Sequence, residues 1–372
     1  MMTEATPDRF RHRQDTVSLR ICLLTTQELD ADPFPDDDWP CDPRPFLPEA
    51  TWHLATLDDK HSSAAEVERL VRWGRFDLFF NLCDGAADQD LPGIEVIETL
   101  ERLDVPFTGG TSAFYEPTRE QMKQACRRAG IATPDHVFVR RTADIERAAE
   151  CLKFPLFVKH HSSYASIDLS RASRVVTPAG LRRQARKMLR RHGAALVEEY
   201  VEGSECTVLV AENADDPARP ITYTPVQYRF PAGERFKHEK LKWVDYDGLM
   251  TAPVADPGLA ARLREESARF FVELGGASFA RCDLRVDREG TPYMLEINPN
   301  CGIYYPPTDP GSADICLAHD PAGHEGFTRE LVRAAFRRHA SRRREGREES
   351  RRPGAAAGLA ALAPRDEDPP AL

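Results

Sequence analysis

The stretch FARCDLRVDREGTPYMLEINPNCGI, residues 279–303, predicts two β-strands joined by a turn at 287–290. With that turn Val286 pairs with Thr291, and side chains alternate between the two faces of the hairpin. One face then carries a mostly polar set: Arg281, Asp283, Arg285, Met294, Glu296 and Asn298. The other face carries an apolar set: Cys282, Leu284, Val286, Tyr293, Leu295 and Ile297. We therefore expect one face to pack on a core and the other to carry chemistry.

The polar face needs an explanation, because like-charged carboxylates on neighbouring strands repel unless a positive charge lies between them. Asp283, Glu296 and Asn298 offer oxygen ligands, which Mg²⁺ and similar divalent cations prefer. A solvated hairpin with salt bridges through Arg281 would use the same residue types. Short motifs of this kind often occur by chance, so the rest of the chain has to decide between the two interpretations.

Length and composition indicate the class of protein. A chain of 372 residues can form two or three domains, and its 41% hydrophobic and 30% charged residues are typical of a water-soluble protein. The formal net charge of -10 argues against nucleic acid as the main partner. The sequence has no C-x-x-C or H-E-x-x-H pair to predict a zinc site, and no apolar run long enough to predict a membrane span. We expect a cytoplasmic protein with reduced cysteines and no membrane partner.

The N-terminal part alternates strands and helices. The patterns predict a strand at 17–25, a helix at 62–74, a strand at 76–85, and a helix followed by another strand at 93–110. Ligands of such parallel α/β units bind at the carboxyl ends of the strands, which makes Asp84, Gly109 and Gly110 candidate substrate contacts. Ordinary turn chemistry accounts for the same residues, so this assignment stays open.

A second alternating unit follows. The patterns predict a helix at 118–130, a strand at 135–139, a helix at 142–152, a strand at 154–161, a helix at 177–193 and a strand at 194–201. Lys159 ends an apolar run, where an ammonium group needs either an anionic partner or a path to water. A phosphate would be a suitable anion. The Glu-Gly-Ser break at 202–204 can present backbone groups to an adenine edge, with Glu205 accepting from ribose hydroxyls.

Five collinear motifs carry a resemblance to a known family: Lys123, Lys159, EEYVEGSE at 198–205, RCD at 281–283 and EINPNCG at 296–302. In order and spacing they resemble the ATP-grasp ligases, most closely the D-alanine:D-alanine ligase-like branch, over roughly residues 76 to 305. The resemblance implies an α/β protein with an ATP-grasp fold and an N-terminal Rossmann-like (pre-ATP-grasp) α/β domain. The expected parts are a disordered arm at 1–16, the N-terminal domain at 17–115, a central ATP-grasp subdomain at 116–202, a C-terminal subdomain with the metal site at 203–340, and a disordered tail at 341–372.

The same resemblance implies ATP as cofactor together with Mg²⁺, with Mn²⁺ as the alternative metal. It implies that Lys159 contacts the phosphates, Glu205 binds the ribose, and the adenine slot is lined by Glu198, Glu199 and Val201. Further nucleotide contacts are expected from Arg119, Lys123, Ser166 and Lys242, with Lys240 as the alternative to Lys242 at the γ-phosphate. Arg281 and Lys242 are the catalytic candidates, and the metal ligands are Asp283, Glu296 and Asn298.

The expected reaction is carboxylate–amine ligation through an acyl phosphate, with an amino acid or peptide among the substrates and a homodimer among the open oligomeric states. The sequence departs from the family pattern in its flap at 159–175, KHHSSYASIDLSRASRV, which contains no glycine and has Ala165 where the substrate-positioning serine is expected. The Gly-Gly-x-Ser-x-Glu signature is also missing after the first strand. Both departures argue against D-alanyl-D-alanine as the product. Phosphotransfer to another acceptor and a non-catalytic regulatory role remain alternatives.

Overall fold

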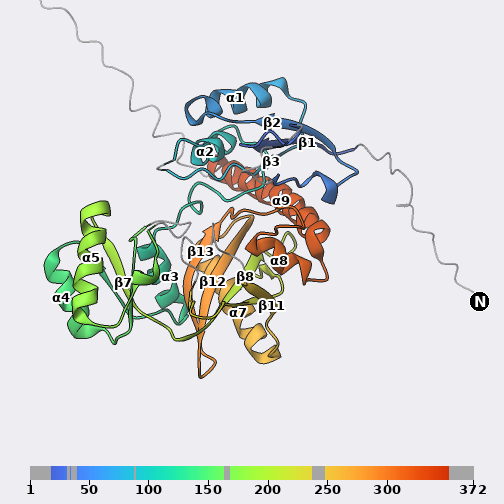
Figure 1. Cartoon of the computed structure of the whole chain (residues 1–372). Helices are drawn as coiled ribbons and strands as arrows, with labels where there is room; N and C mark the ends of the chain where they lie inside the picture. The colour runs from blue at the N-terminus through green and yellow to red at the C-terminus, as the bar shows by residue number, and fades with distance from the viewer. Residues whose placement is uncertain are drawn as a thin grey trace, which may run out of the picture.

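The computed structural model describes residues 18–31, 34, 40–87, 89–162, 168–236 and 248–351, with side chains as far as residue 345. In this part of the chain the strands form three sheets, and the long C-terminal helix α9 runs between the first and the third of them (Figure 1). The predicted arm at 1–16, the flap residues 163–167 and the segment 237–247 lie outside the described residues. The described helices include none that is long and apolar enough to cross a membrane.

The N-terminal sheet is parallel, as the alternating pattern predicts, and its strand order is β2-β1-β3. Its elements are β1 (Arg20–Thr25), η1 (Arg44–Phe46), β2 (Thr51–Thr56), α1 (Lys60–Trp73), β3 (Leu78–Asn81) and α2 (Ile94–Arg102). Asp59 caps α1 by accepting from two backbone N–H groups, and Gly74 ends it in the left-handed conformation. The strand expected after α2 does not form; that part of the chain makes only an isolated bridge from Phe107 to Phe79. Strand β2, in contrast, is present but was not predicted from the sequence.

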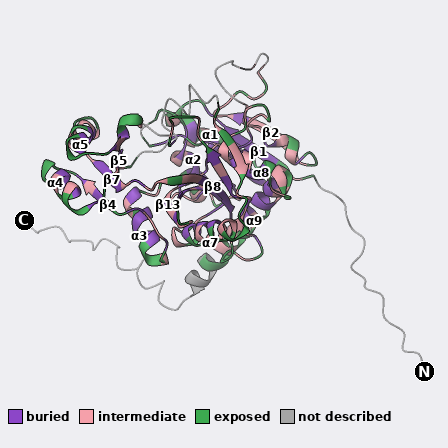
Figure 2. Ribbon diagram, turned by 60° about the horizontal axis from the view of Figure 1, so that its bottom comes forward, coloured by how far each residue is buried: buried purple, intermediate pink, exposed green. Residues whose placement is uncertain are grey.

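The central sheet is antiparallel with the order β4-β7-β5-β6. Its elements are α3 (Arg119–Ala129), β4 (His136–Val139), α4 (Thr142–Cys151), β5 (Leu156–Lys159), η2 (Arg171–Ser173), β6 (Arg174–Val175), α5 (Pro178–His192) and β7 (Ala195–Glu199). The apolar sides of α4 and α5 pack on this sheet, and their exposed residues face outward in Figure 2. The strands and helices predicted for this part of the chain are confirmed.

The third sheet has the order β11-β10-β8-β12-β13, and β9 pairs with β8 at its edge. Its elements are β8 (Gly203–Ala211), β9 (Ile221–Thr222), β10 (Val226–Arg229), β11 (Met250–Pro253), α7 (Pro257–Glu273), β12 (Phe279–Asp287), β13 (Pro292–Pro299), α8 (Ser312–Ala318) and α9 (Gly323–Arg351). Buried residues of α3 and α7 pack on one face of β8, β12 and β13. The opposite face of β12 and β13 is therefore left for the pocket described below.

The hairpin β12–β13 forms as predicted, but the predicted register is wrong near the turn. The N–H of Asp287 donates to the carbonyl of Thr291, at 3.0 Å, so the loop is one residue shorter than expected. Gly290 ends that loop with a φ of 82°, a conformation that glycine adopts at low cost. Val286 consequently lies opposite Pro292 instead of Thr291.

A β-bulge at Leu295 then changes the phase of β13. Leu284 lies opposite Met294, but its neighbour Asp283 lies opposite Glu296, so Leu295 is the extra residue. Met294 is therefore buried in the core, whereas Leu295 lines the pocket, which reverses both predictions. The bulge also returns Glu296 to the pocket face. The polar face thus keeps its two carboxylates.

Helix α9 corrects the predicted tail boundary. The helix continues without a break from Gly323 to Arg351, so ordered structure does not end at residue 340. Within it Arg338 pairs with Glu212 and donates to the carbonyl oxygens of Phe107, at 2.7 Å, and Gly109, at 3.3 Å. The helix therefore connects the N-terminal sheet with the third sheet.

Candidate active site

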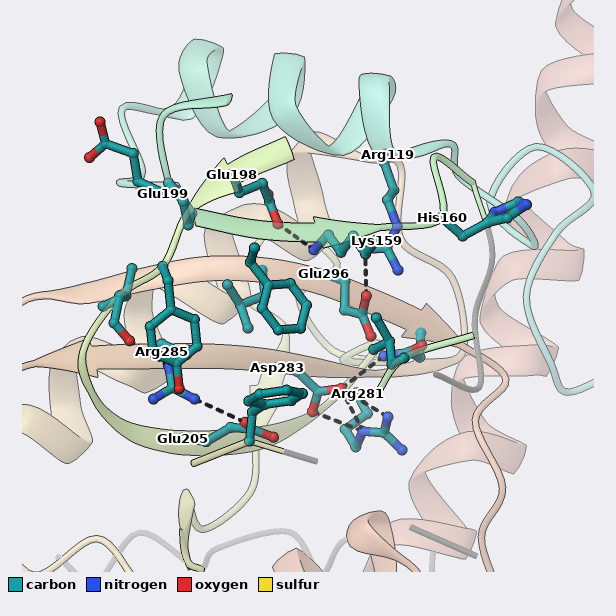
Figure 3. A pocket seen from close by; sticks show the side chains of 18 of the residues that line it. Arg119, Lys159, His160, Glu198, Glu199, Glu205, Arg281, Asp283, Arg285 and Glu296 are labelled. Carbon is teal, nitrogen blue, oxygen red and sulfur yellow. Dashed lines mark hydrogen bonds and ion pairs between the residues drawn. The ribbon is translucent and has the colours of Figure 1, made fainter. Parts of the chain in front are cut away.

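A pocket lies between the central and the third sheets (Figure 3). One wall comes from α3, β5, β7 and the linker to β8, and the other comes from β12 and β13. Most of the sequence-predicted site residues line it: Arg119, Lys159, Glu198, Glu199, Val201, Glu205, Arg281, Asp283, Glu296 and Asn298. The structure therefore brings into one pocket residues that are far apart in the sequence.

At one end of the pocket Lys159 and Lys123 share the carboxylate of Glu198. The Nζ atom of Lys159 lies 2.5 Å from Oε2 of Glu198, and Lys123 contacts Oε1 of the same group. Burial would raise the pKa of Glu198, but the two lysines outweigh it and hold that pKa well below its usual range. Burial, with a contribution from the nearby Arg119, lowers the pKa of Lys159 to about 8.

Lys123 does not line the pocket, although it was predicted to contact nucleotide. Its side chain is only 2% exposed, and its Nζ atom also donates to Oγ1 of Thr133 at 2.7 Å. Thr133 in turn donates to the carbonyl of Met294. Lys123 thus lies behind the wall and supports Glu198 and β13.

Arg119 holds the second carboxylate of the pocket. Thr118 and Gln121 form a capping box at the start of α3, which places Arg119 at the first helical position. Its Nη1 atom lies 2.6 Å from Oε2 of Glu296. Burial would raise the pKa of Glu296, but Arg119 and Lys159 lower it, so this carboxylate is ionised.

Arg281 holds the third carboxylate, that of Asp283. Its Nε and Nη2 atoms donate to the two carboxylate oxygens at 3.0 and 2.9 Å. Thr207 donates to the same carboxylate at 2.8 Å and Asn298 donates to it at 3.1 Å. Each hairpin carboxylate therefore has its own guanidinium partner, Arg281 for Asp283 and Arg119 for Glu296.

The predicted metal ligands form a donor set that fits a hard divalent cation. Asp283 lies directly opposite Glu296 across the hairpin, and Asn298 is hydrogen-bonded to Asp283. Two carboxylates and one amide are ligands of the kind that Mg²⁺ accepts. Each carboxylate already has a guanidinium partner. An anionic ligand that attracts Arg119 and Arg281 would therefore leave the two carboxylates available for a metal. In the described part of the chain no cluster of three or more His, Cys, Asp or Glu side chains is suited to a metal ion.

Several pocket residues were not predicted. Phe157 stacks on Tyr200 with ring centroids 5.9 Å apart, and it meets Phe236 edge-on at 4.9 Å. Phe157 could have been predicted to line the pocket, because it lies two residues before Lys159 in β5 and residues two apart in a strand share a face. Arg285 was expected on the polar face without a role, and Leu295 was expected on the apolar face, because the bulge that brings it into the pocket was not predicted. The remaining additions are Pro134, His160, Leu169 and Ser312.

Other predicted residues lie elsewhere or outside the described part. Ser166, Lys240 and Lys242 fall in segments that are not described. Asp84, Gly109 and Gly110 do not line this pocket. The N–H of Gly109 donates to Oγ of Ser278 at 2.9 Å, which is a packing contact between the first and third sheets.

Two antiparallel sheets with a pocket rich in cations and carboxylates between them fit the ATP-grasp class of proteins. Residues 125–305 match the family model described as the D-ala D-ala ligase C-terminus. The chain is similar to the D-alanine–D-alanine ligases of the ATP-grasp class, with relatives at about 25–30% identity.

Curated relatives show similarity over a comparable part of the chain. The uncharacterized protein y4sG of Sinorhizobium fredii is 30% identical over 237 residues, covering 61% of this chain and 66% of its own. A D-alanine–D-alanine ligase of Nitrosospira multiformis is 28% identical over 207 residues, covering 55% of this chain and 64% of its own. The chain therefore spans slightly less than two thirds of the length of these relatives.

Solved structures show the same fold. The D-alanine–D-alanine ligase from Bacillus anthracis complexed with ATP gives a TM-score of 0.63 at 16% identity, covering 87% of this chain and 100% of that one. The VanG D-Ala:D-Ser ligase from Enterococcus faecalis gives 0.61 at 14% identity, covering 86% and 99%. The α/β ATP-grasp fold expected from the sequence is thereby confirmed.

Proposed function

We propose that the chain is an ATP-dependent ligase that joins a carboxylate to an amine through an acyl phosphate. The observation that carries this proposal is that Arg119, Lys159 and Arg281 converge on one pocket together with Asp283 and Glu296. Phosphoryl transfer depends on positioning and charge neutralisation more than on a protein nucleophile. The pocket supplies fixed cations for both purposes.

In this proposal the central part, 116–202, and the part that begins at residue 203 form the two sides of the nucleotide site. Lys159 and Arg119 bind the phosphates, because both are buried cations that face the pocket. Arg281 orients the phosphoryl group that is transferred. The adenine slot is formed by Glu198, Glu199 and Val201, and Glu205 accepts from the ribose. Lys242 reaches the γ-phosphate and Ser166 donates to phosphate from the flap.

The charge pairs of the pocket suggest how a nucleotide binds. Phosphate oxygens compete with Glu296 for Arg119 and with Asp283 for Arg281, which leaves both carboxylates available. Asp283, Glu296 and Asn298 would then hold Mg²⁺ or Mn²⁺, which would supply further neutralisation of phosphate charge. When Lys159 turns toward phosphate, Lys123 still neutralises the negative charge of Glu198.

The proposed substrates are a small carboxylic acid and an amine, each an amino acid or a short peptide. The product is proposed to differ from D-alanyl-D-alanine, because Ala165 replaces the expected flap serine and the N-terminal serine signature is missing. Two of the structurally similar proteins, a D-alanine–D-alanine ligase and a D-Ala:D-Ser ligase, already differ in the second amino acid. One fold therefore serves more than one amine.

A screen for ADP release with amino acids and dipeptides, followed by mass spectrometry of the products, tests the proposal. We expect ADP release that depends on an acid and an amine together. With hydroxylamine in place of the amine we expect a hydroxamate, because only an activated acyl group forms one. A phosphorylated product without hydroxamate would indicate a phosphotransferase. ATP binding without ADP release for any pair would indicate a regulatory protein.

A further inference from the structure

Arg285 is a buried cation in the pocket that the proposed phosphate chemistry does not use. It lies on β12, is 4% exposed, and is directly opposite Glu205 in the register of β12 with β8. Its guanidinium donates to four acceptors: the carbonyl oxygens of Val201 at 2.7 Å, Gly203 at 2.9 Å and Arg235 at 3.1 Å, and Oε2 of Glu205 at 3.3 Å. Its Cζ atom also lies 4.7 Å from the centre of the Tyr200 ring.

Two of these acceptors, Val201 and Arg235, lie outside the strands, whereas Gly203 and Glu205 belong to β8. Val201 lies in the linker between β7 and β8, and Arg235 immediately precedes the pocket residue Phe236. A guanidinium group donates in a fixed planar fork, so it sets the relative positions of the groups that accept from it. Arg285 therefore joins the linker, the Arg235 segment and Glu205 at one point.

We infer that Arg285 is a positioning residue for the nucleoside half of the ligand. It orients Glu205 toward the ribose hydroxyls and holds the linker beside the base, and this inference rests on the proposed ATP site. In Figure 3 Arg285 and Glu205 lie together at one side of the pocket, apart from the pair of Arg119 and Glu296. Its removal should therefore affect nucleoside recognition more than phosphoryl transfer.

A residue that only stabilises the fold would weaken the binding of every nucleotide to the same extent. An orienting role changes the discrimination between ligands with and without ribose hydroxyls. The readout is therefore the ratio of the dissociation constants of 2′,3′-dideoxy-ATP and ATP, both with Mg²⁺, measured by titration calorimetry. A uniform loss of affinity cancels in this ratio.

The test variant is Arg285→Met, which keeps much of the side-chain volume but removes the donors. The matched control is Arg288→Met, the same substitution at an exposed position in the turn of the same hairpin. We expect the wild-type protein and the control to prefer ATP by about tenfold or more, because hydrogen bonds to a charged group are strong. In Arg285→Met we expect ATP to bind about tenfold more weakly and the ratio to fall toward one.

Arg285→Lys keeps the charge, and it provides a second test if the methionine variant does not fold. An ammonium group cannot replace the planar fork, so we expect this variant also to lose most of the discrimination. A folded Arg285 variant that keeps the wild-type ratio would overturn the inference, and so would a wild-type ratio near one. A wild-type protein that binds neither nucleotide would instead refute the proposed function, and the inference with it.

Discussion

Lys159 and Lys123 approach the same carboxylate, that of Glu198, from two elements that are distant in the sequence. Lys159 lies at the end of β5, Lys123 lies in α3, and Glu198 lies in β7 between them. Two ammonium groups and one carboxylate leave a net positive charge next to the pocket. A buried site with that charge is suited to an anionic ligand, because burial weakens screening by water.

The first prediction concerns Lys159, whose pKa is lowered to about 8 by burial and by Arg119. A bound polyphosphate stabilises the charged ammonium and raises this pKa, so ATP binding takes up a proton when the pH exceeds that value. The affinity for ATP should accordingly decrease as the pH rises above about 8. Calorimetry at about pH 8.5 in two buffers with different ionisation heats measures the uptake.

The control for this prediction is Lys159→Arg. An arginine keeps its charge throughout the same pH range, so this variant should bind ATP without proton uptake. Equal binding heats for the wild-type protein in the two buffers, after correction for dilution, would contradict the prediction.

The second prediction is that Glu198→Gln destabilises the protein by about 3–5 kcal/mol, because two buried lysines lose their counter-charge. Denaturant unfolding of the variant and the wild-type protein measures this difference. Glu146→Gln, which breaks the surface pair with Arg182, is the matched control and should cost under about 1 kcal/mol. A similar loss in both variants would show that the lysines contribute nothing specific.

The lowered pKa of Glu198 also leads us to expect that the free energy of unfolding decreases in acid. Its pKa is depressed in the folded protein, so its contribution is complete above the ordinary carboxyl value of 4.5 and is lost as the pH falls below it. The acid-induced decrease in the free energy of unfolding should therefore be smaller in Glu198→Gln than in the wild-type protein.

The third prediction is that Glu296→Gln lowers Mg²⁺-dependent ADP formation by at least about 100-fold, while the fold is retained. Glutamine keeps the shape of the side chain but removes one of the two carboxylates that would hold the metal. Glu289→Gln, at an exposed position of the same hairpin turn, is expected to have normal activity. Wild-type turnover by Glu296→Gln would refute the proposed metal role.

The fourth prediction is that Arg338→Met destabilises the protein by about 2–4 kcal/mol, because Glu212 and the carbonyls of Phe107 and Gly109 lose a charged donor. Arg343→Met removes only an exposed pair with Asp104 and should cost under about 1 kcal/mol. Thermal or denaturant unfolding of the two variants provides the comparison. Equal stability of both would mean that α9 does not connect the first and third sheets energetically.

The regular elements near the site could be predicted because their signals are local. The apolar period and the Thr118 and Gly130 caps define α3, and the apolar run that ends at Lys159 defines β5. The strand β2 was missed, and the short strands β9, β10 and β11 were not predicted either. A short strand is stabilised mainly by its neighbours in the sheet, which a local pattern does not show.

The amino-acid sequence by itself determined the polar face of the hairpin, the order of the motifs and the family resemblance. Each of these depends on neighbouring residues or on the spacing of motifs along the chain. The tertiary structure decided the register and the partners. The bulge at Leu295 accompanies a hydrogen bond from the N–H of Met294 to the carbonyl of Ala132, 2.8 Å away in the segment after α3. Similarly, Lys123 meets Glu198 and Arg285 meets Glu205 only because separate elements pack together. Ion pairs and hydrogen bonds form between groups that are close in space, whatever their separation in the sequence. Only folding brings these distant parts of the chain together.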